Sequence, residues 1–245
     1  MMKKAHICIF IISLFLGSFF NGFGQVQSSP EIQIDSISYM ERYGVRIGAD
    51  LSKPIRTLLD KDYQGFEIKG DFRITNNLYP AVEIGYEDFD FDENNFDANS
   101  KGGYAKLGAN YNVYSNWIGM QNEIYVGLRY GFATYSETLY NYTVYDKDHY
   151  FPPDYKEVNQ KYNNLNAHWV EFQVGIKAEV LHNLYLSLHA QVKRIITSNE
   201  PKNFDILWIP GYNRNYADSP FGIGWGYSVS YMIPLLKKER VQKID

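Results

Sequence analysis

The sequence predicts an all-β protein, namely an eight-stranded antiparallel up-and-down transmembrane β-barrel of the outer-membrane type that follows an N-terminal signal peptide. Three observations carry this prediction. Apolar and polar residues alternate with a period of two in eight separate segments, the connections between these segments are alternately long and short, and the only long apolar run lies at the extreme N-terminus.

Residues 1–24 have the three-part order of a secretory signal peptide. Two lysines precede an apolar run over residues 7–20, and small residues occupy positions suited to cleavage before Gln25. The run is shorter than the roughly 20 residues that a spanning helix needs. The only cysteine, Cys8, lies within this segment, so the mature chain is predicted to have no disulfide and no thiol chemistry.

The composition of the chain excludes some classes of partner and cofactor. The formal net charge is −4 and aromatic residues make up 17% of the chain, with 22 tyrosines. Nucleic acid is excluded as a partner, because phosphate binding requires clustered lysine and arginine. No zinc-ligand spacing and no phosphate-binding glycine loop occurs, so we expect neither a metal nor a cofactor.

The clearest β-hairpin covers Ala167–Arg194. Apolar residues occupy the even positions and polar or charged residues the odd positions over residues 169–180, and the alternation resumes over 184–193 after a short break. Strands of this length suit a tilted crossing of a bilayer, which takes about 9 to 11 residues.

Six further segments repeat the pattern, and they complete the predicted barrel over residues 41–234. These strands are Tyr43–Leu51, Phe66–Ile74, Ala81–Glu87, Tyr104–Val113, Glu123–Phe132 and Phe221–Tyr231. Residues 25–40 are predicted to form a periplasmic lead-in, and residues 235–245 a basic periplasmic tail. With an even number of strands, both termini are periplasmic and the long connections are extracellular.

The polar face is predicted to line the lumen. A row of Gly222, Gly224 and Gly226 suits a narrow interior, and aromatic residues near strand ends, such as Tyr43 and Trp225, suit the membrane boundaries. Charges of both signs on the polar faces can pair across a small lumen: Arg46, Asp50, Glu67, Lys69, Asp71, Arg73, Glu83, Lys106, Glu123, Arg129, Glu171, Lys177, Glu179, His189 and Lys193. A soluble lipocalin-like barrel, with the apolar face inside, is the alternative that alternation alone leaves open.

Aromatic residues gather in the long connections, which are predicted to be irregular over residues 137–166 and 197–220. They are candidates for surface recognition, with mutual packing of the loops as the alternative: Tyr140, Tyr142, Tyr145, Tyr150, Tyr155, Trp208 and Tyr212. An acidic connection over residues 88–102 begins like a calcium loop but lacks the glycine and glutamate of an EF-hand, which leaves only loose divalent binding open.

Four segments resemble a Bacteroidota family of small outer-membrane β-barrel proteins that is catalogued only as a domain of unknown function. These segments are Asp50–Arg56, Tyr125–Phe132, Ala167–Phe172 and Ile209–Arg214. The resemblance implies the fold and an outer-membrane location, but no activity. The partners of such a barrel are outer-membrane lipid, lipopolysaccharide and the barrel assembly machinery.

One pair of residues raises an enzymatic alternative. Ser187 and His189 are similar to the His-x-Ser pairing of barrel lipid A deacylases, but their order is reversed and both lie on the charged face. We therefore expect a non-enzymatic protein with a structural or surface-recognition role. A barrel enzyme that modifies envelope lipid and a soluble periplasmic ligand carrier stay as alternatives.

Overall fold

The computed structural model describes residues 36–117, 120–144, 154–199, 205–215 and 219–243. The predicted signal peptide and most of the predicted lead-in lie outside these residues. Contacts divide the chain into a compact unit, Ser38–Val241, and a second unit formed by the two chain ends. The features below belong to the compact unit.

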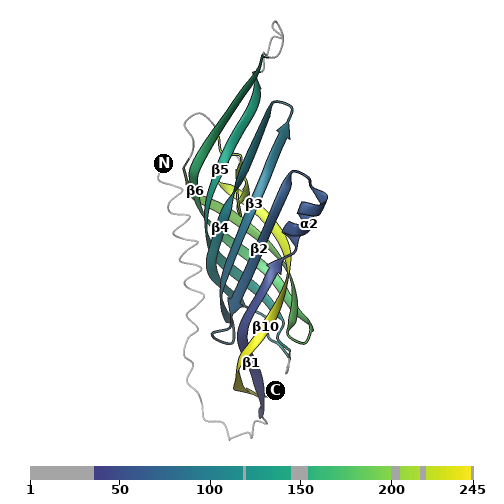
Figure 1. The fold of residues 1–245 in the computed structure, drawn as a ribbon. Coiled ribbons are helices and arrows are strands. Elements are labelled where there is room, and N and C mark those ends of the chain that lie inside the picture. Colours follow the sequence, from purple (N-terminus) through teal and green to yellow (C-terminus); the bar gives the residue numbers. More distant parts are fainter. Residues whose placement is uncertain (1–35, 118–119, 145–153, 200–204, 216–218, 244–245) are drawn as a thin grey trace, which may run out of the picture. The chain divides into compact units, whose positions relative to one another are not determined.

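Eight antiparallel strands close into a barrel in the order β1-β10-β7-β6-β5-β4-β3-β2, which confirms the predicted fold (Figure 1). The strands of the ring are β1 (Ser36–Asp50), β2 (Tyr63–Phe72), β3 (Leu78–Glu93), β4 (Phe96–Asn112), β5 (Glu123–Val144), β6 (Asp154–Leu181), β7 (Leu184–Ser198) and β10 (Phe221–Lys243). Short turns and the described ends of β1 and β10 lie at one end, which we call the turn end. The long connections lie at the other, the hairpin end. Every described helix is too short to span a bilayer.

The register of β6 and β7 follows from the alternation that predicts them. Phe172 pairs with Val192 on the outer face, and Glu171 pairs with Lys193 on the inner face. The turn between the strands places Asn183 at a φ of 64°, a left-handed conformation that asparagine tolerates better than most residues. A one-residue slip would exchange the two faces, so the pattern fixes the register.

The outer face of the barrel is apolar on every strand of the ring. Side chains on this face are exposed and aliphatic or aromatic: Ile47, Ile68, Ile84, Leu107, Leu128, Phe172, Leu188 and Ile223. They form a belt that spans Ile124–Phe132 on β5 and Val170–Val180 on β6. We call this surface the apolar belt.

An aromatic pair marks the edge of the apolar belt toward the hairpin end on β2 and β3, where Phe66 stacks on Tyr86 with ring centroids 6.4 Å apart. Trp225 and Tyr227, whose ring centroids lie 6.0 Å apart, stand within the belt, since they pair with Ala190 and Leu188. The prediction for Tyr43 was wrong, because this ring is buried. Its hydroxyl donates to a side-chain oxygen of the turn between β2 and β3, which draws the ring inward.

The strands extend well beyond the predicted ranges at the hairpin end. The acidic connection is a β-hairpin in which β3 continues to Glu93 and β4 begins at Phe96. Most of residues 137–166, predicted to be irregular, continues β5 and β6 as a paired ribbon. Beyond the belt the outward faces of these hairpins are largely polar, while their inward faces carry buried apolar residues such as Phe91, Ala98 and Leu139.

At the turn end, β1 and β10 also extend past the predicted barrel limits. β10 continues to Lys243 through most of the segment predicted to be a basic tail, and β1 begins at Ser36 inside the predicted lead-in. An ion pair of 2.8 Å joins Arg240, in the extension of β10, to Glu41 at the start of the predicted barrel. This contact ties the extension to β1 in a region that apolar patterning does not indicate.

The connection between β1 and β2 contains a short helix, α2 (Ser52–Leu59). Its polar side faces the barrel, since the Thr57 hydroxyl accepts a hydrogen bond of 3.0 Å from the backbone N–H of Gly65. Its apolar side, with Leu58 and Leu59, is exposed. The helix is amphipathic with its apolar face turned away from the protein.

Two register shifts bend the β5–β6 ribbon above the belt, between Tyr135 and Glu137 and between Leu139 and Asn141. On the partner strand, Asn159 and Asn164 have positive φ values of 50° and 58°. Such bulges increase local twist.

Candidate functional site: the lumen and its plug

The structure places all fifteen charged residues predicted for the lumen inside the barrel, where they are buried or nearly so. We call them, with their ion pairs, the lumen network. The glycine row of β10 also faces inward, since an added Cβ at Gly224 or Gly226 would meet the side chain of Gln191 or His189. The polar face is therefore the interior face.

Lys106 is the centre of the lumen network. Its ammonium group lies 3.1 Å from Glu83, 3.3 Å from Glu67 and 3.4 Å from Glu171. Arg129 shares Glu83 at 3.1 Å. The five residues lie on five neighbouring strands, β2 to β6. Their ion pairs therefore join these strands across the lumen.

Toward the turn end, Asp71 accepts from two cations. It lies 2.5 Å from Arg46 and 2.6 Å from Lys177, and Arg46 also contacts Glu123. The remaining pairs of the network follow the same rule of cation beside carboxylate: Lys69 with Asp50 and Glu67, Lys193 with Glu171, Arg73 with Glu41, and Arg42 with Glu179.

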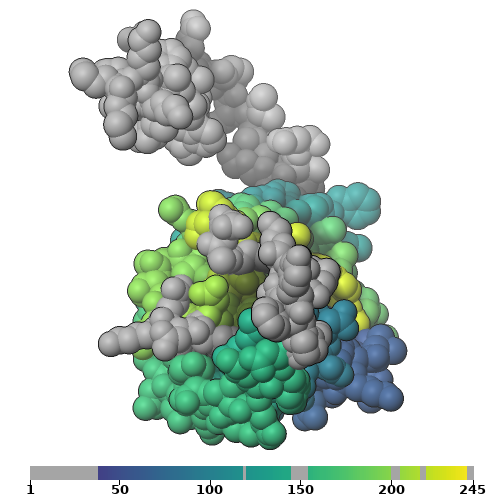
Figure 2. Space-filling model, turned by 90° about the horizontal axis from the view of Figure 1, so that it is seen from above, coloured from purple at the N-terminus to yellow at the C-terminus, as the bar shows by residue number. Residues whose placement is uncertain are grey.

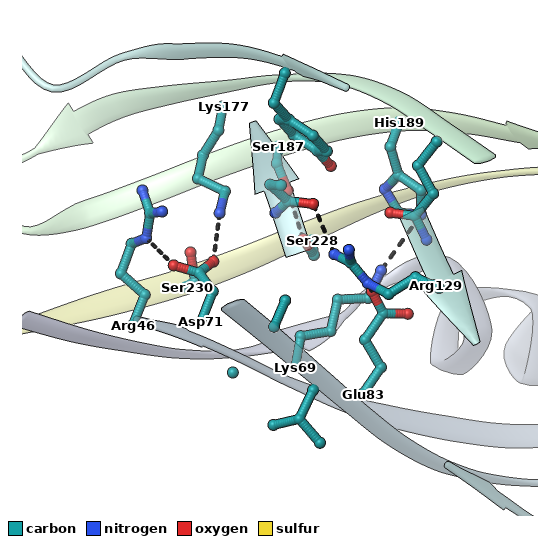
Figure 3. Close-up of a pocket in the computed structure, with 16 residues that line it drawn as sticks. Arg46, Lys69, Asp71, Glu83, Arg129, Lys177, Ser187, His189, Ser228 and Ser230 are labelled. Atoms are coloured by element: carbon teal, nitrogen blue, oxygen red, sulfur yellow. Dashed lines mark hydrogen bonds and ion pairs between the residues drawn. The ribbon is translucent and has the colours of Figure 1, made fainter. Parts of the chain in front are cut away.

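A small cavity of about 30 Å³ lies within this network. Figure 3 shows Arg46, Asp71 and Lys177 on one side of it, and Lys69, Glu83 and Arg129 on the other. The volume corresponds to about one water molecule. At this level the lumen is filled by side chains, as expected for a barrel of eight strands.

A short hairpin closes the lumen at the hairpin end. It is formed by β8 (Trp208–Ile209) and β9 (Asn213–Arg214), and Gly211 in its turn has a φ of +78°. Residues 206–212 are buried apart from the half-buried Leu207, and we call them the plug. They belong to a connection that the sequence predicts to be a surface loop.

Charged residues of the barrel wall hold the plug in place. Glu87 accepts from the backbone N–H of Gly211 at 3.0 Å and from the indole N–H of Trp208 at 3.1 Å. Lys193 donates to the carbonyl oxygens of Gly211 at 2.8 Å and Tyr212 at 3.2 Å. These contacts satisfy backbone groups that would otherwise be buried without partners.

Glu137 supports the plug from β5, above the apolar belt. Its carboxylate accepts from the backbone N–H groups of Leu207 at 3.0 Å and Trp208 at 3.3 Å. Burial raises the pKa of Glu137 to about 7, while the hydrogen bonds from Trp208, Leu207 and Ser100 act in the opposite direction. Ser100, opposite on β4, also donates to the carbonyl oxygen of Trp208 at 2.8 Å.

Ser187 and His189 do not form a nucleophile and base pair. The Ser187 hydroxyl lies 2.5 Å from the hydroxyl of Ser228, and Nε2 of His189 lies 3.3 Å from the ammonium group of Lys69. Both side chains are buried in the interior and line the small cavity of the lumen network, and the larger cavity beside α2 is lined by His189 but not by Ser187.

The structure separates the seven aromatic candidates for surface recognition. Tyr140 and Tyr155 are exposed on the projecting ribbon, while Tyr142 packs beside Phe91 and Phe96. Trp208 and Tyr212 are buried in the plug and so are not at the surface. Tyr145 and Tyr150 lie outside the described residues. Figure 2 looks onto this end, with β5 and β6 (teal to green) on one side of the rim and α2 and β2 (blue) on another.

Two carboxylates of the acidic hairpin, those of Asp88 and Asp90, are bound within it. Asn99 donates to Asp88 at 2.6 Å and to Asp90 at 2.8 Å. Within residues 36–117, 120–144, 154–199, 205–215 and 219–243, no group of three or more histidines, cysteines or carboxylates has the arrangement of a metal site.

Sequence reasoning placed Lys193 in the lumen but missed two other residues that support the plug, Glu137 and Tyr63. Glu137 continues the odd-numbered inward positions of β5, but it falls beyond the last apolar residue of the predicted strand. Tyr63 precedes the predicted start of β2, yet its hydroxyl donates to Glu87 at 3.0 Å. Continuing the odd-numbered inward positions of β5 and β2 beyond the apolar belt would have identified both residues.

A family profile matches residues 6–238 of the chain, nearly its whole length. The chain belongs to this family, which is described as a domain of unknown function (DUF6048). The resemblance to a family without an assigned activity is thereby confirmed. No curated protein matches the chain. Among solved structures, the chain is similar to the crystal structure of Ail, the attachment invasion locus protein of Yersinia pestis, with 12% identity and a TM-score of 0.38 over 82% of this chain and 100% of that chain.

Proposed function

We propose that the protein is an integral β-barrel of the outer membrane with both termini in the periplasm, and that the hairpin end is extracellular. The observation that carries the proposal is the facing of the barrel, because the apolar belt is on the outside and the lumen network is on the inside. A soluble protein rarely exposes so continuous an apolar surface. The belt on β5 and β6 has the length of a bilayer crossing, about 9 to 11 residues.

The boundaries of the belt support the same placement. The aromatic pair of Phe66 and Tyr86 lies where the headgroups of the outer leaflet would begin, the level that such rings prefer in membrane proteins. Helix α2 lies at this level with Leu58 and Leu59 exposed. An amphipathic helix with its apolar face outward suits a position at the surface of a bilayer.

We infer a structural or surface-recognition role without enzymatic activity. A lumen filled by ion pairs and closed by the plug does not suit a channel. The exposed Tyr140 and Tyr155 on the projecting ribbon are the candidates for contacts outside the cell, because tyrosine offers rigid contact area with a polar tip. A lipocalin-like carrier is disfavoured, since the interior that it would use for an apolar ligand is charged.

Fractionation of the native host tests this proposal, followed by gel mobility of the detergent-extracted protein with and without boiling. We expect recovery with the outer membrane and a mobility shift on boiling, because a closed barrel unfolds only on heating. Recovery of a soluble protein from the periplasm would contradict the proposal.

A further inference from the structure

The barrel wall has a notch beside helix α2. Strand β1 ends at Asp50, and its pairing with β2 stops at Ala49 opposite Ile68. The neighbouring strands continue toward the hairpin end, β2 over residues 63–67 and β10 over residues 221–226. Within the described residues no strand fills the space between these two segments, and α2 lies there instead (Figure 1).

A cavity of about 530 Å³ occupies the notch and connects the two environments that the rest of the wall separates. Its inner part is lined by Glu67, Lys106 and Lys193 of the lumen network. Its outer part is lined by Ile223 and Trp225, which belong to the apolar belt. The volume lies within the range of small-molecule sites, about 300 to 1,000 Å³.

The missing neighbour strand leaves the outer wall of the notch unusually open. Ile223 is 81% exposed and Trp225 is 69% exposed, whereas Leu128, which has strands on both sides, is 63% exposed and Phe172 is 51% exposed. These two side chains therefore offer an apolar surface at the point where the wall gives access to charged groups.

Helix α2 supplies the outer lip of the cavity. Lys53 and Arg56 line it from the polar face of the helix, and Ile55 and Leu59 line it from the apolar side. Arg56 is 39% exposed, its guanidinium carbon lies 4.0 Å from the centroid of the Tyr63 ring, and it pairs with the partly exposed Asp60 at 3.1 Å, so the charge is positioned by these two contacts and still reaches solvent. The cavity is lined by more cationic than anionic groups: Lys53, Arg56, Lys106 and Lys193 against Asp50 and Glu67.

We propose that the notch binds a single-chain or phospholipid-like amphiphile with an anionic headgroup, which enters sideways from the outer leaflet. The headgroup binds Arg56 and Lys53, and the acyl chain lies along Ile223 and Trp225. This inference rests on the proposed membrane location. The shared chemistry of the ligand is a carboxylate or phosphate attached to an apolar chain, and both halves are needed because the cavity has both kinds of wall.

Photolabelling of the purified full-length barrel in dodecyl maltoside tests the site. The probe is hexadecanoic acid with a photoreactive group near the chain end, and labelled peptides are identified by mass spectrometry. We expect labelling of the peptide that carries Ile223 and Trp225, and competition by phosphatidylglycerol but not by phosphatidylcholine. Arg56→Gln should lower labelling about tenfold, the effect of losing one charge-assisted hydrogen bond, and Arg56→Lys should restore most of it.

Two matched controls separate the notch from the rest of the belt. Lys161→Gln removes an exposed cation of the β6 ribbon and should leave labelling unchanged. Trp225→Ala should reduce labelling, while Phe172→Ala, a belt residue between two strands, should not. The mobility shift on boiling is measured for every variant, so that loss of the folded barrel is recognised independently of labelling.

Three results would overturn the inference. Equal labelling around Phe172 and Trp225 that does not depend on Arg56 would mean ordinary contact with surrounding lipid. Competition by inorganic phosphate alone would mean a free-anion site. A protein that shifts on boiling but is not labelled at the notch would remove this inference and leave the proposed barrel intact, whereas a protein without the shift would remove the proposed function itself.

Discussion

Ionisation of Glu137 should loosen the plug as the pH rises. The pKa of this carboxyl is about 7 in the folded protein, against 4.5 for an ordinary glutamate. The folded state therefore binds the proton more tightly than an opened state does. The stability that depends on the protonated form is complete below about pH 4.5 and is lost as the pH rises through 7.

The size of the effect follows from the pKa difference of about 2.5 units, which corresponds to a limit of about 3 kcal/mol well above pH 7. Between pH 6 and pH 8 the same relation gives about 1.3 kcal/mol, or nearly a tenfold increase in the population of the opened plug. Glu137→Gln keeps the acceptor for the backbone N–H groups of Leu207 and Trp208 and cannot ionise. We expect this variant to show no such increase.

Hydrogen exchange of the Leu207 and Trp208 amides in detergent, corrected for the intrinsic pH dependence of exchange, measures the opening. Protection should fall from pH 6 to pH 8 in the native protein and stay constant in Glu137→Gln. Glu157→Gln, at an exposed carboxylate of the β6 ribbon, is the matched control and should behave like the native protein. Equal loss of protection in the native protein and in Glu137→Gln would refute the reasoning.

Three further changes test the barrel, the plug and the lumen. Phe172→Arg should destabilise the membrane-inserted barrel by about 2 to 4 kcal/mol in urea titrations in liposomes, while Val158→Arg, on the same strand above the belt, should have little effect. Gly211→Ala should destabilise the closed plug by about 1 to 3 kcal/mol, because of its positive φ and a nearby tyrosine ring. The measurement is faster hydrogen exchange of the plug amides, and Gly103→Ala, where an added Cβ has no close neighbour, is the control. Lys106→Met should destabilise the folded barrel by about 3 to 5 kcal/mol, since it leaves carboxylates buried without their cation. The loss should appear as a lower temperature for the mobility shift, and an unchanged temperature would contradict the role of Lys106.

The barrel was predictable because the two faces of each strand meet different surroundings, so apolar and polar residues alternate along its sequence with a period of two. Val170 and Phe172 against Glu171 and Gln173 determine the facing and the register of β6 without any knowledge of its neighbours. The pattern changes where the hairpins leave the belt, since their outward side chains become polar and their buried ones include Phe91 and Leu139. For this reason the strands over residues 137–166 were expected to be loops.

The plug could not be predicted, because its stability depends on residues distant in the sequence. Trp208 and Tyr212 have the composition of a recognition loop, and only the closed barrel brings Glu87 to the indole N–H of Trp208 and Lys193 to the carbonyl oxygen of Tyr212. The lumen network was easier to foresee, since each charged side chain occupies an inward position set by its own strand. Which charge pairs with which still required the order and stagger of the strands.

The free edge of β6 has a consequence for how copies of the protein behave beside one another. Within the described residues the ladder between β7 and β6 begins at Ala167, and the backbone N–H of Asn199 donates to the carbonyl oxygen of Asn166, so β6 has no strand beside it on this side over residues 154–165. A flat edge of this length would template the addition of another chain. The kinks at Asn159 and Asn164 and the charges of Lys156 and Lys161 make it a poor template, and the ribbon can therefore project without joining copies of the protein edge to edge.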